Sequence, residues 1–253
     1  MPNARSFIGL PRKFKNKFLI YPPKIADVVG NDEFSLYRHI FTITADDIKD
    51  QIKKKDGEEA KIPTPFEFLL INCYYDKNFA EMTKKAFEFF THQKITILYE
   101  QKIIIIGDIE QVVQEIQSID ELIILKEEEY FDFQNAIRES LGEKPIKPPE
   151  PEDPNENPII ARIKAKARER DRIKARQNSK DGISLDTTLA AICCMGIGLT
   201  PLNIGEMSYA AIGQIMSMMQ DKEKYDIDIR SLLAGADSKK IKPKYWIRNN
   251  NNE

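Results

Sequence analysis

A run of 19 residues without any charged side chain, residues 187–205, limits most strongly what this chain can fold into. Five of the seven methionines lie within this run or shortly after it: Met195, Met207, Met216, Met218 and Met219. A helical region this apolar has to pack on itself, on another domain or on a partner. Because Gly196, Gly198 and Pro201 interrupt the run, the sequence predicts a buried helix-turn-helix here rather than a transmembrane helix.

The composition places the chain among ordinary globular proteins and gives no global sign of a charged partner. The 253 residues include 38 basic and 40 acidic side chains, so no overall field favours nucleic acid or a membrane surface. The cysteines Cys73, Cys193 and Cys194 stand in apolar surroundings and are interpreted as small core residues of a reducing compartment. The N-terminus shows no cationic-then-apolar signal peptide, so we expect a cytoplasmic protein.

A proline-rich stretch divides the chain. Residues 144–158 contain six prolines and four acidic residues, which can build neither helix nor sheet and predict an extended linker. We therefore expect an α+β domain over residues 1–143, a basic helix over residues 159–180, and a helical domain with a C-terminal tail over residues 181–253. The predicted fold class is α+β.

The first part of the chain alternates helix and strand signals. Thr64, Pro65 and Glu67 form a capping box with proline at the first helical position, and residues 44–47 offer a similar start. Residues 95–100 and 102–107 are two short runs rich in isoleucine, which predict a β-hairpin. The remaining predictions for this part are a strand over residues 17–21 and helices over residues 44–54, 76–91, 109–117 and 127–141.

The second part of the chain reads as helical throughout. Predicted helices cover residues 159–177, 184–196, a short stretch from residue 200, residues 208–222 and residues 226–233, the last one closed by Gly235.

The basic helix is the first candidate for binding a partner. Its cationic side chains include Arg162, Lys166, Arg170, Arg172 and Arg176. This charge could follow a phosphate backbone, but no aromatic residue is interleaved to stack on bases. The alternatives are a solvated helix, or one that attracts an acidic linker or an acidic partner helix, and these are favoured over nucleic acid.

The methionine-rich helices are the second candidate. Methionine is unbranched and polarizable, so it adapts to apolar partners of different shapes. Met207, Met216, Met218 and Met219 could therefore line a groove for amphipathic helices of a client, or they could simply fill a core.

The C-terminal tail carries the only tryptophan of the chain. Tyr245, Trp246 and Ile247 follow a proline in an otherwise polar segment, which suggests a docking strap. The strap could dock on its own domain or on another subunit.

The sequence contains no motif typical of a catalytic, metal-binding or cofactor-binding site. The only histidines, His39 and His92, have no second ligand at metal spacing, and Cys193 and Cys194 are adjacent rather than in a C-x-x-C pair. Phosphate-binding glycine loops are missing from the sequence. We therefore expect neither an enzyme nor a bound cofactor.

Two segments in the last part of the chain carry a family resemblance. The segment GLTPLNIGEMSYAAIGQIMSMMQ, residues 198–220, places a threonine and proline before a small apolar helix, and KYDIDIRSLLAGADSKKIKPKYWIRN, residues 224–249, continues to a basic end with tryptophan. This layout resembles the tail assembly chaperones of tailed bacteriophages. The resemblance covers about residues 198–249, and the chain departs from the family by being much longer than a minimal chaperone.

The resemblance implies a non-enzymatic protein of the bacterial host cytoplasm that binds the helical tape-measure protein and delivers it to tail-tube subunits. The positions that match the family's helical layout are Leu199, Pro201, Met207, Ile212, Ile215, Met216, Leu232 and Leu233. Together with Met219 these residues, proline aside, form the expected apolar client site. The greater length leaves open a structural role in the virion, at the neck, tube end or baseplate, and a homo-oligomer.

Overall fold

The computed structural model describes residues 4–56, 62–107, 123–146, 170, 184–237 and 240–247. Contacts between Cα atoms divide the chain into two units, which are described separately. Unit 1 comprises residues 1–145 and 202–253, and unit 2 comprises residues 146–201. The predicted division is therefore wrong in one respect: the C-terminal helices do not form a domain of their own, because residues 202–253 belong to the same unit as the N-terminal part.

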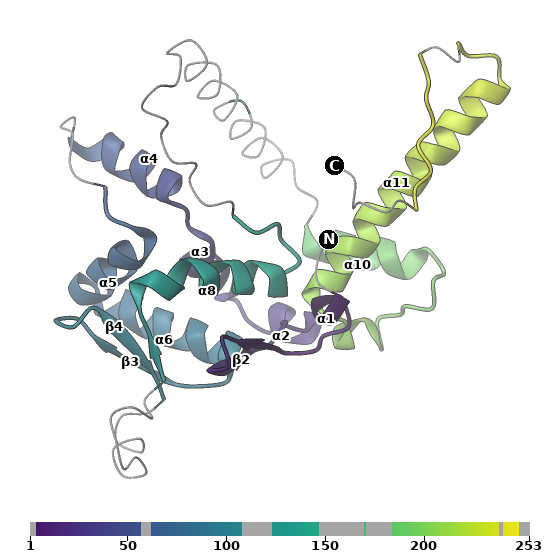
Figure 1. Ribbon diagram of the computed structural model, residues 1–253. Coiled ribbons are helices and arrows are strands. Elements are labelled where there is room, and N and C mark those ends of the chain that lie inside the picture. Colours follow the sequence, from purple (N-terminus) through teal and green to yellow (C-terminus); the bar gives the residue numbers. More distant parts are fainter. Residues whose placement is uncertain are drawn as a thin grey trace. The chain divides into compact units, whose positions relative to one another are not determined.

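Unit 1 is an α+β structure with two small antiparallel sheets, as Figure 1 shows. Its helices are α1 (Ala4–Phe7), α2 (Ile25–Val29), α3 (Phe34–Thr42), α4 (Ala45–Asp56), α5 (Pro65–Tyr75), α6 (Lys77–Thr91), α8 (Glu127–Ser140) and α11 (Tyr209–Leu233), with a 3-10 turn η2 (Ile204–Glu206). Its strands are β1 (Arg12–Phe14), β2 (Phe18–Ile20), β3 (Ile95–Leu98), β4 (Ile103–Ile106) and β5 (Ile124–Leu125).

The starts of α4 and α5 follow from their capping residues. The Thr64 hydroxyl accepts from the Glu67 amide, while the Glu67 carboxylate accepts from the Thr64 amide. Thr44 and Asp47 make the same reciprocal pair before α4. Both predicted capping boxes are confirmed, because each hydroxyl and carboxylate satisfies an amide that the first helical turn leaves free.

The predicted hairpin is also confirmed, and it belongs to a larger sheet. β3 pairs antiparallel with β4 from Ile95 opposite Ile106 to Leu98 opposite Ile103. β5 adds a third strand on the other edge of β4. The predicted strand over residues 17–21 appears as β2, which pairs with β1 in a separate two-stranded sheet.

The core of unit 1 is built from aromatic side chains on several helices. α6 lies at its centre and packs against α3, α5, β2 and β3. Phe87 of α6 stacks on Phe133 of α8, with 4.9 Å between ring centroids, and meets Phe41 of α3 edge-on. All three rings are fully buried. Such offset and edge-to-face pairs add to the free energy gained by removing apolar area from water.

Two predictions about the C-terminal helices are wrong. The predicted helices over residues 208–222 and 226–233 are a single helix, α11, because residues 223–225 contain no helix breaker and charged residues propagate a helix well. The short helix predicted from residue 200 is a turn followed by η2. The helix predicted over residues 109–117 lies outside the described residues.

In unit 2, the structure gives full bounds for the helix α10 (Leu185–Cys194). It begins at Ser184, whose hydroxyl accepts from the Thr187 amide, as the sequence predicts for a helix starting there. The uncharged run that includes α10 is not a buried helix-turn-helix. Ile192 is buried, whereas Met195 and Ile197 are exposed. The prediction that all three cysteines are core residues is also wrong, because Cys194 is exposed.

Candidate protein-binding surface

The first turn of α11 is fixed to the N-terminal part of unit 1 by backbone hydrogen bonds. The Ile25 amide donates to the Met207 carbonyl at 2.9 Å, and the Tyr209 amide donates to the Pro23 carbonyl at 2.8 Å. These two bonds flank an antiparallel bridge between Lys24 and Ser208. The residues that begin α11 therefore pair with residues 23–25 through backbone hydrogen bonds, as two short antiparallel strands do.

Ser208 connects three parts of unit 1. Its hydroxyl accepts from the Ala211 amide, which caps α11, and donates to the Phe7 carbonyl of α1 at 2.9 Å. The side chain is almost fully buried. Above this junction the Tyr209 ring meets Phe34 of α3 at 5.3 Å between centroids. Side chains therefore reinforce the backbone anchor of α11.

Beyond its first turn, α11 leaves the core. Ala210, Ala211 and Ile212 are buried, but no residue from Gly213 to the end of the helix is buried. This stretch nevertheless carries nine large apolar side chains: Ile215, Met216, Met218, Met219, Tyr225, Ile227, Ile229, Leu232 and Leu233. A helix of 25 residues is about 37 Å long. Most of that length therefore offers apolar side chains to the surroundings.

The spacing of these side chains is typical of a helix that packs on another helix. Intervals of three and four residues separate five of these side chains and one lysine: Ile215, Met218, Lys222, Tyr225, Ile229 and Leu232. Residues at this spacing form one stripe along a helix. Met216 and Met219 lie next to the stripe. Met218 is 40% exposed and the other apolar members of the stripe are half-buried.

The eight residues predicted to bind a client are distributed in three ways. Ile212, Ile215, Met216, Met219, Leu232 and Leu233 lie on α11, Met207 lies just before it, and Leu199 lies in unit 2. Ile212 is buried and belongs to the anchor, whereas Leu233 is 82% exposed. The structure thus places most of these residues along a helix surface, and sequence reasoning missed Tyr225, Ile227 and Ile229, which the helix pattern could have shown.

The predicted docking tail lies along α11 of its own chain. Figure 1 shows the segment after α11 turning back beside the helix. The Tyr245 ring meets Tyr225 edge-on, with 5.5 Å between centroids. Trp246 is half-buried, while Tyr245 remains 56% exposed and Ile247 55% exposed. Of the two predicted docking sites, the structure therefore presents the one on the same unit.

Of the predicted basic site, Arg162, Lys166, Arg172 and Arg176 lie outside the described residues. Arg170 is described as helical and exposed.

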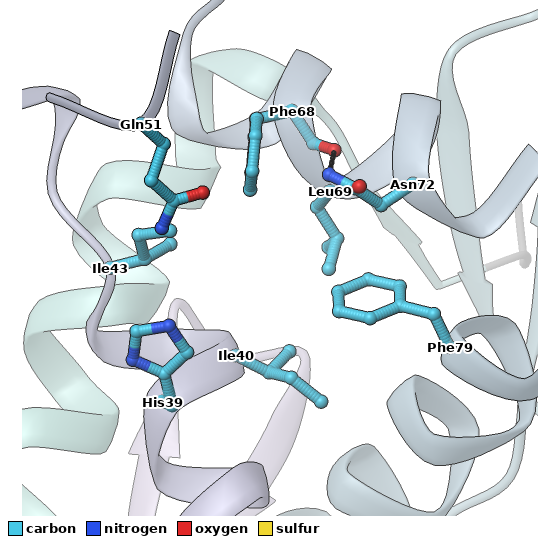
Figure 2. A pocket seen from close by; sticks show the side chains of 8 residues that line it. All are labelled: His39, Ile40, Ile43, Gln51, Phe68, Leu69, Asn72 and Phe79. Atoms are coloured by element: carbon cyan, nitrogen blue, oxygen red, sulfur yellow. Dashed lines mark hydrogen bonds between the residues drawn. The ribbon is translucent and has the colours of Figure 1, made fainter. Parts of the chain in front are cut away.

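A cavity of about 180 Å³ lies elsewhere in unit 1. It is lined by residues from α3 to α6: His39, Ile40, Ile43, Gln51, Phe68, Leu69, Asn72 and Phe79. Figure 2 shows Gln51 and His39 on one side and Phe79 on the other, with the Asn72 amide bonded to the Phe68 carbonyl. None of the predicted client residues lines it. No sequence pattern predicted this cavity, because the apolar residues of its walls look like ordinary core positions.

Cys73 and His92 of unit 1 both have neighbours that the structure describes. The Cys73 thiol is buried and bonds to the Thr83 hydroxyl at 3.4 Å, and burial raises its pKa to about 11. His92 stacks on Tyr21 rather than facing a nucleophile. Within the residues that the structure covers, no three His, Cys, Asp or Glu side chains cluster as a metal site would require.

None of the helices among the described residues combines the length and the apolar character needed to cross a membrane. The chain matches none of the family models, curated proteins or solved structures with which it was compared.

Proposed function

We propose that this chain is a non-enzymatic assembly protein that binds a long helical client along α11. The observation that carries the proposal is the contrast within α11, whose first turn is buried while the apolar side chains that follow are not. The part of this stripe that stays exposed gains free energy only when a partner covers it, since apolar area left in water contributes nothing.

The chemistry of the stripe favours a helical partner of variable sequence. Met216, Met218 and Met219 lie together in the middle of α11, where unbranched thioether side chains can adapt to differently shaped neighbours. The three-and-four spacing matches that of an amphipathic helix laid alongside. Charged residues between the apolar positions, among them Asp221 and Lys222, would orient such a partner.

The resemblance to phage tail assembly chaperones suggests the identity of the client and the place of action. The proposed client is a tape-measure-like protein, and the chain acts in the cytoplasm of the bacterial host before tail-tube subunits polymerise. A long amphipathic helix aggregates when it is alone, so a protein that covers its apolar face keeps it soluble.

Co-expression with a long, heptad-rich protein encoded beside this chain's gene tests the proposal. The wild-type chain should increase the soluble fraction of that protein and co-purify with it. Replacing Met218 and Met219 together by Asp should lower the recovered client at least tenfold, because each charge would have to be buried in the interface. Gln220→Asp, an exposed change on the same helix, should leave recovery as in wild type.

The outcome is informative only if the variants are folded, so circular dichroism and urea denaturation accompany each one. Equal client recovery with the folded double variant and with wild type would exclude α11 as the binding surface.

A further inference from the structure

The C-terminal tail shows what kind of segment α11 accepts near its end. Residues 240–247 read Lys-Ile-Lys-Pro-Lys-Tyr-Trp-Ile. The lysines Lys240, Lys242 and Lys244 are exposed, while Ile241 and Pro243 between them are half-buried. This alternation is typical of an extended segment that lays one face on a surface and turns the other to water.

The face of α11 that carries Tyr225 has properties that match those of the tail. Tyr225, Ile229 and Leu232 share one face of α11 and are half-buried, and Tyr225 makes the ring contact with Tyr245. Asp226 and Asp228 stand on either side of this face and are half-buried as well. An apolar strip with carboxylates beside it complements a segment in which lysines alternate with apolar and aromatic residues.

The contact between tail and helix is loose. Tyr245 and Ile247 keep more than half of their surface exposed although they are docked. The tail is joined to α11 through Gly235, whose φ of +93° lies in a region that glycine adopts readily. A segment that buries so little is held by a small free energy, so an external segment of the same chemistry can replace it.

We propose that the Tyr225 face of α11, formed by Tyr225, Ile229 and Leu232, binds a short, extended segment of a partner protein that is rich in lysine and aromatic residues. In the structure, the chain's own tail occupies this site. This inference rests on the proposed function and specifies the chemistry of one part of the partner. Binding of that segment displaces the tail, and the tail therefore lowers the affinity of the site for the partner.

A labelled peptide with the sequence of residues 240–247 tests this proposal on the full chain. The peptide should bind saturably and more weakly at high salt, since lysine–carboxylate attraction is screened. The double variant Tyr245→Ala, Trp246→Ala should bind the peptide more tightly than wild type, because its own tail competes less well. Tyr225→Ala should bind about tenfold more weakly, as expected for loss of one aromatic pair with its buried area.

Matched controls and an internal probe accompany the titration. Tyr74→Ala removes an exposed tyrosine of α5 and should bind the peptide as wild type does. A peptide with its three lysines replaced by glutamate should not bind. Because Trp246 is the only tryptophan of the chain, displacement by a peptide with Phe in place of Trp should shift its fluorescence to the red.

Two results would overturn the proposal. One is a tail-weakened variant that binds the peptide no better than wild type. The other is a chain that ignores the peptide but forms a dimer that Tyr225→Ala dissociates, because the occupant of the face would then be a second copy. Neither result changes the outcome of the co-expression test with the Met218 and Met219 double variant. Failure of the peptide-binding proposal is therefore distinguishable from failure of the proposed function.

Discussion

Gly142, at the end of α8, lies directly against Ala210 in the first turn of α11. A Cβ atom built on Gly142 would stand 2.9 Å from the Ala210 Cα atom, closer than side chains approach backbone. Gly142 also has a φ of +75°. This contact lets α11 approach the end of α8, so it links the anchored part of α11 to the core of unit 1.

Gly142→Ala should therefore destabilise the protein. The new methyl group meets backbone atoms and the residue must keep a left-handed conformation, so we expect a loss of about 2 kcal/mol or more in the free energy of unfolding. Urea denaturation measures it. Gly213→Ala is the control, because no neighbouring atom of the described residues lies within 4 Å of its Cβ position and alanine favours a helix interior. Equal midpoints for the two variants would contradict the close contact.

Ser208→Ala should weaken the anchor of α11. The change removes the cap of the helix and leaves the partly buried Phe7 carbonyl without the hydroxyl that now donates to it. We expect a cost of about 1–2 kcal/mol, larger than for Ser184→Ala, which removes only the exposed cap of α10. Thermal unfolding of both variants compares the two costs. A larger loss at Ser184 would show that α11 is not held through its cap.

Tyr130→Phe should stabilise the protein. The Tyr130 hydroxyl is fully buried and, among the residues that the structure describes, none pairs with it, while burial raises its pKa strongly. Removing an unsatisfied polar group from the core should increase the free energy of unfolding by about 1 kcal/mol. Tyr99→Phe is the opposite case, since the Tyr99 hydroxyl donates to the Cys73 carbonyl at 3.2 Å. A lower denaturation midpoint for Tyr130→Phe would mean that the hydroxyl has a partner.

Cys73 should resist alkylation in the native protein. Its pKa of about 11, raised by burial, leaves almost no thiolate at pH 8, and the side chain is only 2% exposed. Cys194 is exposed and should react first. Mass spectrometry after iodoacetamide treatment, with and without urea, separates the two sites. Equal labelling of both cysteines in the absence of urea would contradict the packing around Cys73.

Stability should fall in alkaline solution because of Tyr37. Burial, aided by the hydrogen bond that its hydroxyl donates to Glu33 at 2.6 Å, raises the pKa of Tyr37 to about 12. The folded state thus favours the neutral phenol, so this contribution is present below pH 10 and is lost as the pH rises from 10 through 12. Tyr37→Phe should reduce the fall in the free energy of unfolding over this pH range, whereas Tyr74→Phe, at an exposed tyrosine, should not.

Local rules predicted a good part of this fold. The capping boxes at Thr44 and Thr64 and the hairpin from Ile95 to Ile106 depend on residues close in sequence, and all three are present. The continuity of α11 was missed because its apolar pattern weakens around residue 223, although no residue there ends a helix. Helix continuity depends on the absence of a breaker rather than on an unbroken apolar stripe.

The candidate site was predicted only in outline. The sequence pointed to Met216, Met219 and the tail, but it could not show that Met207 joins the anchor through its carbonyl or that Tyr245 meets Tyr225. Both facts depend on pairings between distant segments, which no local propensity encodes. The cavity beside His39 was missed for the same reason, since four helices together form it.

The bridge at Lys24 also sets an order of events on the ribosome. Lys24 and its ion-pair partner Glu206 are 182 positions apart. At translation rates of roughly 5–20 residues per second, the segment around Ile25 is made roughly 10–35 seconds before the strand-like residues that complete it. Newly made chains therefore expose an unpaired backbone edge for that interval, during which chaperones that bind nascent polypeptides can act on it.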